Sequence, residues 1–137
     1  MKHLKIGLVG VGFIGKQHIE AIRRIPGSEV VAVADNNADM ARQVADQFCI
    51  PKWYGDYREL LADPKVELVH NCTPSSSHYG VNKEAIAAGK HIYCEKPLTL
   101  TADEAAELVV LAREAGVAAG VNLNYRHNVM VKEMRER

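Results

Sequence analysis

Residues 4–15, LKIGLVGVGFIG, join an apolar run to three glycines in the pattern G-x-G-x-x-G. The pattern predicts a strand that turns tightly into a helix. Gly10 permits the turn, Gly12 lets the backbone approach a pyrophosphate, and Gly15 lets the helix pack against the strand. The N-terminus of such a helix offers free N–H groups and a positive dipole end to phosphates. This stretch therefore predicts half of a dinucleotide-binding unit.

A second apolar run, residues 30–34, ends at Asp35, twenty residues beyond Gly15. A carboxylate at this point of a dinucleotide site accepts hydrogen bonds from the adenosine ribose. It pairs with the 2′-hydroxyl of NAD and repels the 2′-phosphate of NADP. The next three residues, NNA, include no arginine that would neutralise that phosphate. We therefore expect NAD rather than NADP as the cofactor.

Two other interpretations of the glycines stay open on the sequence alone. Gly10 and Gly15 followed by Lys16 match G-x-x-x-x-G-K, the beginning of a P-loop. A P-loop then needs Ser or Thr to hold Mg²⁺, and this chain has Gln17 instead, which disfavours a kinase or ATPase. The second alternative is a glycine-rich turn that binds nothing.

Length and composition limit the class of protein. The 137 residues are enough for one domain, and 17 basic residues balance 17 acidic ones, so we expect neither nucleic acid nor a membrane as partner. No apolar run reaches the roughly 18 residues of a membrane span. The N-terminus leads directly into the first apolar run, so we expect no signal peptide and a cytoplasmic location. Three cysteines without C-x-x-C spacing favour buried thiols over a disulfide or metal site, and the histidines show no metal-ligand spacing.

Apolar runs alternate along the chain with helical patterns, which predicts α/β class and a doubly wound parallel sheet (Rossmann fold) of about six strands with helices on both faces. We expect strands near 4–9, 29–34, 66–71, 90–94 and 117–122, and a short extended piece at 51–54. We expect helices near 13–24, 38–48, 56–62, 78–88 and 101–115, and a last helix from about 128.

Local patterns add detail to three of these helices. In the second, Met40, Val44 and Phe48 share one face and are expected to be buried. In the fifth, Thr101 and Glu104 form a capping box, and Gly116 ends the helix. Asp56 and Glu59 make a similar start for the third helix.

Polar residues collect where three successive predicted strands end. In a doubly wound sheet, ligands bind at the carboxyl ends of the strands, where the strand order reverses. We therefore expect one shared pocket at this edge. The residues concerned are Thr73, Pro74, Ser75 and His78 after the first of these strands, Glu95, Lys96 and Pro97 after the next, and Asn122, Asn124, Tyr125 and Arg126 after the last.

The segments GVGFIG with Asp35, CTPSSSH, AGKHIYCEKPL and NYR, in this order and spacing, resemble the N-terminal domain of the Gfo/Idh/MocA oxidoreductases. The resemblance covers essentially the whole chain, and Glu95-Lys96-Pro97 is its most specific part. Ser75 departs from it, because many members have Asn there. The resemblance implies an NAD-dependent sugar, polyol or cyclitol dehydrogenase. It also implies a dinucleotide-binding domain at 1–125 and, at 126–137, the start of a connection to a C-terminal substrate domain that this chain lacks.

Particular roles follow from the resemblance. Lys96 is the expected catalytic residue, acting with a histidine of the second domain, and Tyr125 and Arg126 border the small-molecule substrate. Association into a homo-oligomer is possible in a full-length form. The residues expected to bind the cofactor are Gly10, Gly12, Phe13, Ile14, Gly15, Asp35, Thr73, Pro74, Ser75, His78, Glu95, Lys96 and Asn124.

Structural interpretations stand beside these roles. Lys96 and Arg126 could be solvated charges, and His78 could simply help to begin its helix. His18, at helical spacing with Ile14 and Ile22, is expected to be a partly buried helix residue, and His70, His91 and Cys94 are assigned to packing or the surface. A cis peptide bond before Pro97 would aim Lys96 inward.

Two alternative functions also remain at this stage. One is an NAD-dependent glycosidase of the same superfamily, which oxidises its substrate transiently before eliminating the aglycone. The other is a stand-alone NAD-binding module without catalysis. Without the second domain, we expect the chain to be catalytically incomplete.

Overall fold

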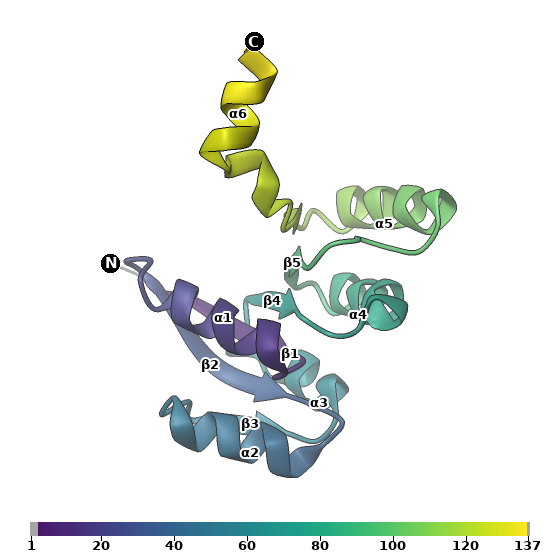
Figure 1. Ribbon diagram of the computed structural model, residues 1–137. Helices are drawn as coiled ribbons and strands as arrows, with labels where there is room; N and C mark the ends of the chain where they lie inside the picture. The colour runs from purple at the N-terminus through teal and green to yellow at the C-terminus, as the bar shows by residue number, and fades with distance from the viewer. Residues whose placement is uncertain (1–2, 137) are drawn as a thin grey trace.

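The computed structural model describes residues 3–136 and contains a sheet of six parallel strands (Figure 1). Their order across the sheet is β3-β2-β1-β4-β5-β6, so the direction of winding reverses between β1 and β4. This is the doubly wound topology that the sequence predicts, with its ligand-binding switch point at the carboxyl ends of β1 and β4. The strands are β1 (Leu4–Val9), β2 (Ser28–Ala34), β3 (Lys52–Tyr54), β4 (Leu68–Asn71), β5 (His91–Cys94) and β6 (Ala119–Val121).

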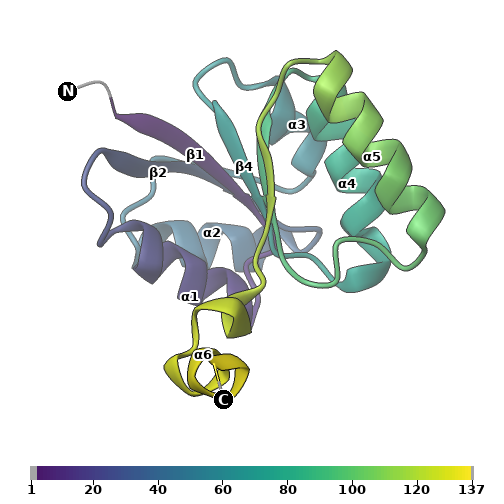
Figure 2. The ribbon, with the colours of Figure 1, turned by 90° about the horizontal axis from the view of Figure 1, so that it is seen from above.

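Helices cover both faces of this sheet: α1 and α2 lie on one face, and α3, α4 and α5 on the other (Figure 2). The short 3₁₀ helix η1 and α6 follow β6, and both views show α6 standing away from the sheet. No helix within residues 3–136 is long and apolar enough to cross a membrane. The helices are α1 (Phe13–Ile22), α2 (Ala38–Gln47), α3 (Tyr57–Ala62), α4 (Ser75–Ala87), α5 (Ala102–Glu114), η1 (Asn124–His127) and α6 (Val129–Glu136).

The starts of α3 and α5 follow the local signals in the sequence. Thr101 and Glu104 form the predicted capping box of α5, and Gly116, with φ +66°, follows its end. Asp56 caps α3 by accepting a hydrogen bond from the Arg58 N–H. The predicted start of α4 at residue 78 is wrong, because the helix begins at Ser75. Pro74 is its N-cap with φ −58°, and proline suits a helix start because its missing N–H is not needed there.

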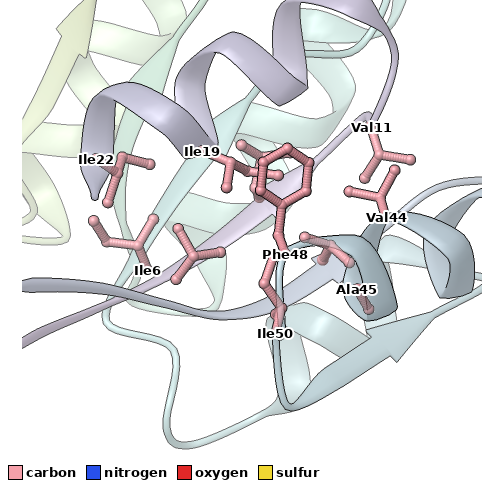
Figure 3. Packing of buried hydrophobic residues seen from close by; sticks show 11 residues of the cluster. Ile6, Val11, Ile19, Ile22, Val44, Ala45, Phe48 and Ile50 are labelled. Carbon is pink, nitrogen blue, oxygen red and sulfur yellow. The ribbon is translucent and has the colours of Figure 1, made fainter. Parts of the chain in front are cut away.

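The largest apolar cluster lies between the sheet and the α1–α2 layer (Figure 3). In this cluster, Ile19 and Ile22 of α1 pack with Val44 and Ala45 of α2. Phe48, the residue after α2, belongs to the same cluster. The prediction that Met40 shares this buried face is wrong: its side chain is 38% exposed, and Ala41 is buried instead. The cluster comprises Ile6, Leu8, Val11, Ile19, Ile22, Val30, Val33, Val44, Ala45, Phe48 and Ile50.

The three cysteines are free thiols, but they are not all buried as expected. Cys94 is buried and Cys72 is partly buried, and burial raises the pKa of both thiols, that of Cys94 to about 11. Cys49 is exposed. It takes a left-handed conformation (φ +51°) just after α2, between Phe48 and Ile50, which both turn into the core. No group of three or more potential metal-binding side chains occurs within the described residues.

Candidate cofactor-binding site

The three fingerprint glycines occupy different environments. Gly10 has φ +89°, and a Cβ there would lie 2.6 Å from the carbonyl oxygen of Cys72. A Cβ on Gly15 would lie 2.1 Å from the carbonyl oxygen of Gly10, so α1 packs against the turn only because this position is glycine. A Cβ on Gly12 would meet no atom within 4 Å. Two glycines are therefore required by the fold, and the third leaves open space above the helix.

That open space lies at the N-terminus of α1. Gly12 is the N-cap residue, and no side chain caps the helix. The first N–H groups of a helix have no partner within it, so here they are available to a ligand, and the helix dipole favours an anion. Phe13, in the same turn, is 78% exposed. This arrangement fits a pyrophosphate.

Asp35 lies at the end of β2, beside the glycine turn. One of its carboxylate oxygens accepts a hydrogen bond from the Val11 N–H at 3.0 Å, and the other accepts one from the Asn37 N–H at 2.9 Å. These bonds fix the orientation of the carboxylate. Each oxygen keeps a second lone pair, so the group can still accept hydrogen bonds from ribose hydroxyls.

One cavity of about 770 Å³ connects these features. Its size falls within the range of small-molecule sites, roughly 300–1,000 Å³. Of the residues that the sequence predicts for the cofactor, it brings together Gly10, Gly12, Phe13, Ile14, Asp35, Thr73 and Pro74. The remaining lining residues, which the sequence did not reveal, are Val9, Asn36, Gly55, Asp56, Tyr57, Arg58, Cys72, Ser77 and Val81.

Tyr57 and Arg58 form a wall of this cavity next to Asp35 and Asn36. The Tyr57 hydroxyl donates a hydrogen bond to Oε1 of Glu84 at 2.8 Å, and the Arg58 guanidinium donates one to the same oxygen at 2.9 Å. The Arg58 guanidinium carbon lies 4.7 Å from the Tyr57 ring centroid. Burial and the hydrogen bond to Glu84 raise the pKa of Tyr57 to about 12, so its hydroxyl stays protonated. The sequence could have indicated these residues, because they follow β3 at the carboxyl edge of the sheet, where ligands bind.

His78 is buried and does not line the cavity. The residue is 1% exposed, and its ring nitrogens lie 2.6 Å from the Pro97 carbonyl oxygen and 2.8 Å from that of Thr73. His78 therefore ties the end of β4 to the turn after β5. Ser75 begins α4 and also lies outside the cavity lining.

Glu95 follows β5, and its carboxylate is turned into the protein. It accepts hydrogen bonds from His18 Nε2 at 2.8 Å, from the Asn122 amide, and from the Lys96 N–H at 3.1 Å. Burial alone would raise the pKa of Glu95, but these three hydrogen bonds outweigh it and hold the pKa below its usual range. The Lys96–Pro97 peptide bond is cis, as suggested by the sequence. The Lys96 residue itself is exposed.

The predicted substrate residues lie apart from the main cavity. Tyr125 and Arg126, and also Asn124, which the sequence predicts for the cofactor, belong to η1 and are exposed. Arg126 borders a second cavity of about 390 Å³, whose other lining residues are Tyr93, Val121, Asn122, Leu123 and His127. The structure thus places most residues expected on the adenosine side together in one cavity, and Arg126, expected near the substrate, beside another cavity at the ends of β5 and β6.

Known proteins share this fold and sequence. A family model described as "Oxidoreductase family, NAD-binding Rossmann fold" matches residues 4–123. Inositol 2-dehydrogenase of Pseudomonas savastanoi is 41% identical over 122 residues, which are 88% of this chain and 35% of that protein. A 1,5-anhydro-D-fructose reductase of Ensifer adhaerens is 37% identical over 130 residues, which are 95% of this chain and 39% of that protein.

A solved structure agrees with the comparison of sequences. The 3-ketoreductase KijD10 of Actinomadura kijaniata, as its Y186F mutant in complex with TDP-benzene and NADP, superimposes with a TM-score of 0.92 at 27% identity. The match covers 98% of this chain and 42% of that one. The chain therefore spans well under half the length of the proteins that it resembles.

Proposed function

The chain belongs to the Gfo/Idh/MocA oxidoreductase family as an NAD-binding Rossmann domain, and we propose that it forms part of an enzyme that transfers a hydride between nicotinamide and a sugar, polyol or cyclitol. The observation that carries the proposal is the cavity that joins the open space over Gly12 to the fixed carboxylate of Asp35. The inositol and anhydrofructose enzymes among the relatives support the class of substrate.

Each part of the site then has a task. The N–H groups at the start of α1 hold the pyrophosphate, and Asp35 holds the adenosine ribose. The bound cofactor supplies the nicotinamide ring that accepts or donates the hydride. Lys96, exposed at the end of β5, donates a hydrogen bond to the substrate oxygen and stabilises the negative charge that develops there.

The remainder of the substrate site is proposed to come from a second domain. The matched relatives are more than twice as long as this chain, and Arg126 borders only a small cavity beside η1. Residues 126–137 would then begin the connection to that domain. We expect the isolated chain to bind NAD without turning over any polyol, and turnover by these 137 residues alone would contradict this part of the proposal.

The proposed preference for NAD gives a direct test. In calorimetric titrations we expect the chain to bind NAD about tenfold or more tightly than NADP, because the Asp35 carboxylate repels the 2′-phosphate. Asp35→Ala removes this repulsion and one acceptor for the ribose. Asp35→Ala should therefore weaken NAD binding and reduce the difference between the affinities for NAD and NADP.

The matched control is Asp103→Ala, which removes an exposed carboxylate from the first turn of α5. It should leave both affinities unchanged. A preference for NAD that persists in Asp35→Ala would show that another residue selects the cofactor. Failure of the unmodified chain to bind either dinucleotide would contradict the proposed function itself.

A further inference from the structure

Residues from three separate elements converge on Glu95. His18 of α1 is 8% exposed, and its Nε2 atom lies 2.8 Å from Oε1 of Glu95. Asn122, which follows β6, donates its amide to the same oxygen, and the Lys96 N–H donates to the other. The carboxylate therefore links α1, the end of β5 and the end of β6.

A second layer of contacts holds the donors in place. Nδ1 of His18 lies 3.0 Å from Nδ1 of His70 on β4, and the two rings meet edge to face with centroids 5.3 Å apart. The Tyr93 hydroxyl donates to the Asn122 amide oxygen at 3.1 Å. Both polar ends of His18 and of Asn122 thus have partners, so the group around Glu95 is fixed by hydrogen bonds on every side.

The other end of the same turn is held independently. His78, reaching from α4 on the opposite face of the sheet, contacts the Pro97 carbonyl oxygen. The turn formed by Glu95, Lys96 and Pro97 is therefore braced by one buried histidine from each side. Between these braces Lys96 and Pro97 are exposed, and Lys96 carries the only ionisable side chain of the two.

We propose that His18 is a positioning residue that couples the phosphate-binding helix to the turn presenting Lys96. This inference rests on the proposed function, in which α1 receives the pyrophosphate and β4–β6 receive the nicotinamide half of the cofactor. His18 lies one turn inside α1, three residues after Gly15. Through Glu95 it fixes the distance between the N-terminus of α1 and the Lys96 backbone, and with it the space for the nicotinamide riboside.

The hydrogen-bond chemistry suggests which substitutions separate positioning from folding. An ionised carboxylate only accepts, so Nε2 of His18 must carry the hydrogen. Glutamine offers an N–H donor at a similar reach, whereas leucine fills the space without a donor. His18→Gln should therefore retain the coupling, and His18→Leu should lose it.

The test is calorimetric titration of the chain with NAD and with ADP, which lacks the nicotinamide riboside. His18→Leu should weaken NAD binding about tenfold, the effect of losing one hydrogen bond to a charged group, and should leave ADP binding within about twofold. His18→Gln should restore most of the NAD affinity. The amide resonance of Lys96 in an NMR spectrum should shift in His18→Leu and return in His18→Gln.

Ile22→Ala is the matched control, because Ile22 is buried on α1 and its side chain has no polar atom that could bond to Glu95. It should lower the melting temperature while keeping the ratio of NAD to ADP affinity. If His18→Leu does not fold, Glu95→Gln tests the same link and should lower that ratio.

Three outcomes would overturn the inference: equal NAD affinity in the unmodified chain and His18→Leu, equal losses for NAD and ADP, or no rescue by glutamine. Failure of the unmodified chain to bind NAD would instead overturn the proposed function.

Discussion

A methyl group at position 12 is expected to abolish NAD binding by this chain without loosening its fold. The Gly12 backbone has φ −64°, which any residue adopts, and a Cβ built there has no neighbour within 4 Å. That space lies over the N-terminus of α1, where the pyrophosphate must approach the backbone. Gly12→Ala should therefore raise the Kd for NAD by about 100-fold or more, measured by calorimetry, because a methyl group there displaces the phosphates from the N–H groups.

Two further Gly→Ala variants give this prediction its controls. In Gly15→Ala the new methyl group meets the carbonyl oxygen of Gly10, so α1 must move, and the free energy of unfolding should fall by about 3 kcal/mol. Gly80 lies within α4 with open space around its Cβ, so Gly80→Ala should keep NAD affinity and add up to about 1 kcal/mol of stability.

The three variants together separate the two uses of glycine. Gly12→Ala should unfold at the same temperature as the unmodified chain, and Gly15→Ala at a much lower one. A Gly12→Ala protein that binds NAD normally would show that the pyrophosphate does not rest on this turn.

The sequence predicts this part of the site well because its constraints are local. The tight turn at Gly10, the packing of α1 at Gly15 and the acid at the end of β2 all lie close together in the sequence, and backbone geometry demands glycine at the first two positions. The capping box at Thr101 and Glu104 is predictable for the same reason. Met40 shows the limit of such patterns, since helical spacing cannot decide whether it or Ala41 faces the sheet.

The rest of the site depends on how distant segments pack. Tyr57 and Arg58 reach the cavity only because β3 lies beside β2, so their strand ends meet the Asp35 loop. Glu95 shows the same effect more strongly. Its carboxylate faces His18, 77 residues earlier, and no pattern in the sequence relates the two positions.

Acidification from pH 8 to pH 5 is expected to destabilise the fold through His70. Burial, and then the neighbouring His18, lower the pKa of His70 from 6.5 to about 3. Between these two values the unfolded chain binds a proton at position 70 that the folded chain does not. The free energy of unfolding therefore falls as the pH falls through this window, by up to about 2 kcal/mol at pH 5.

Urea denaturation at several pH values between 8 and 5 measures this effect. His70→Gln keeps a hydrogen-bonding side chain beside His18 but cannot take up a proton, so its stability should change much less over the same range. His127→Gln, which alters an exposed ring in η1, should keep the full pH dependence. The pKa values of the Glu95 and Asp63 carboxyls are below their usual range. The stability that these ionised carboxylates contribute is therefore lost only at lower pH, and it does not obscure the effect of His70 between pH 8 and pH 5. An unchanged slope in His70→Gln would mean that the pKa of His70 is the same in the folded and unfolded chains, and that the ring is not the source of the pH dependence.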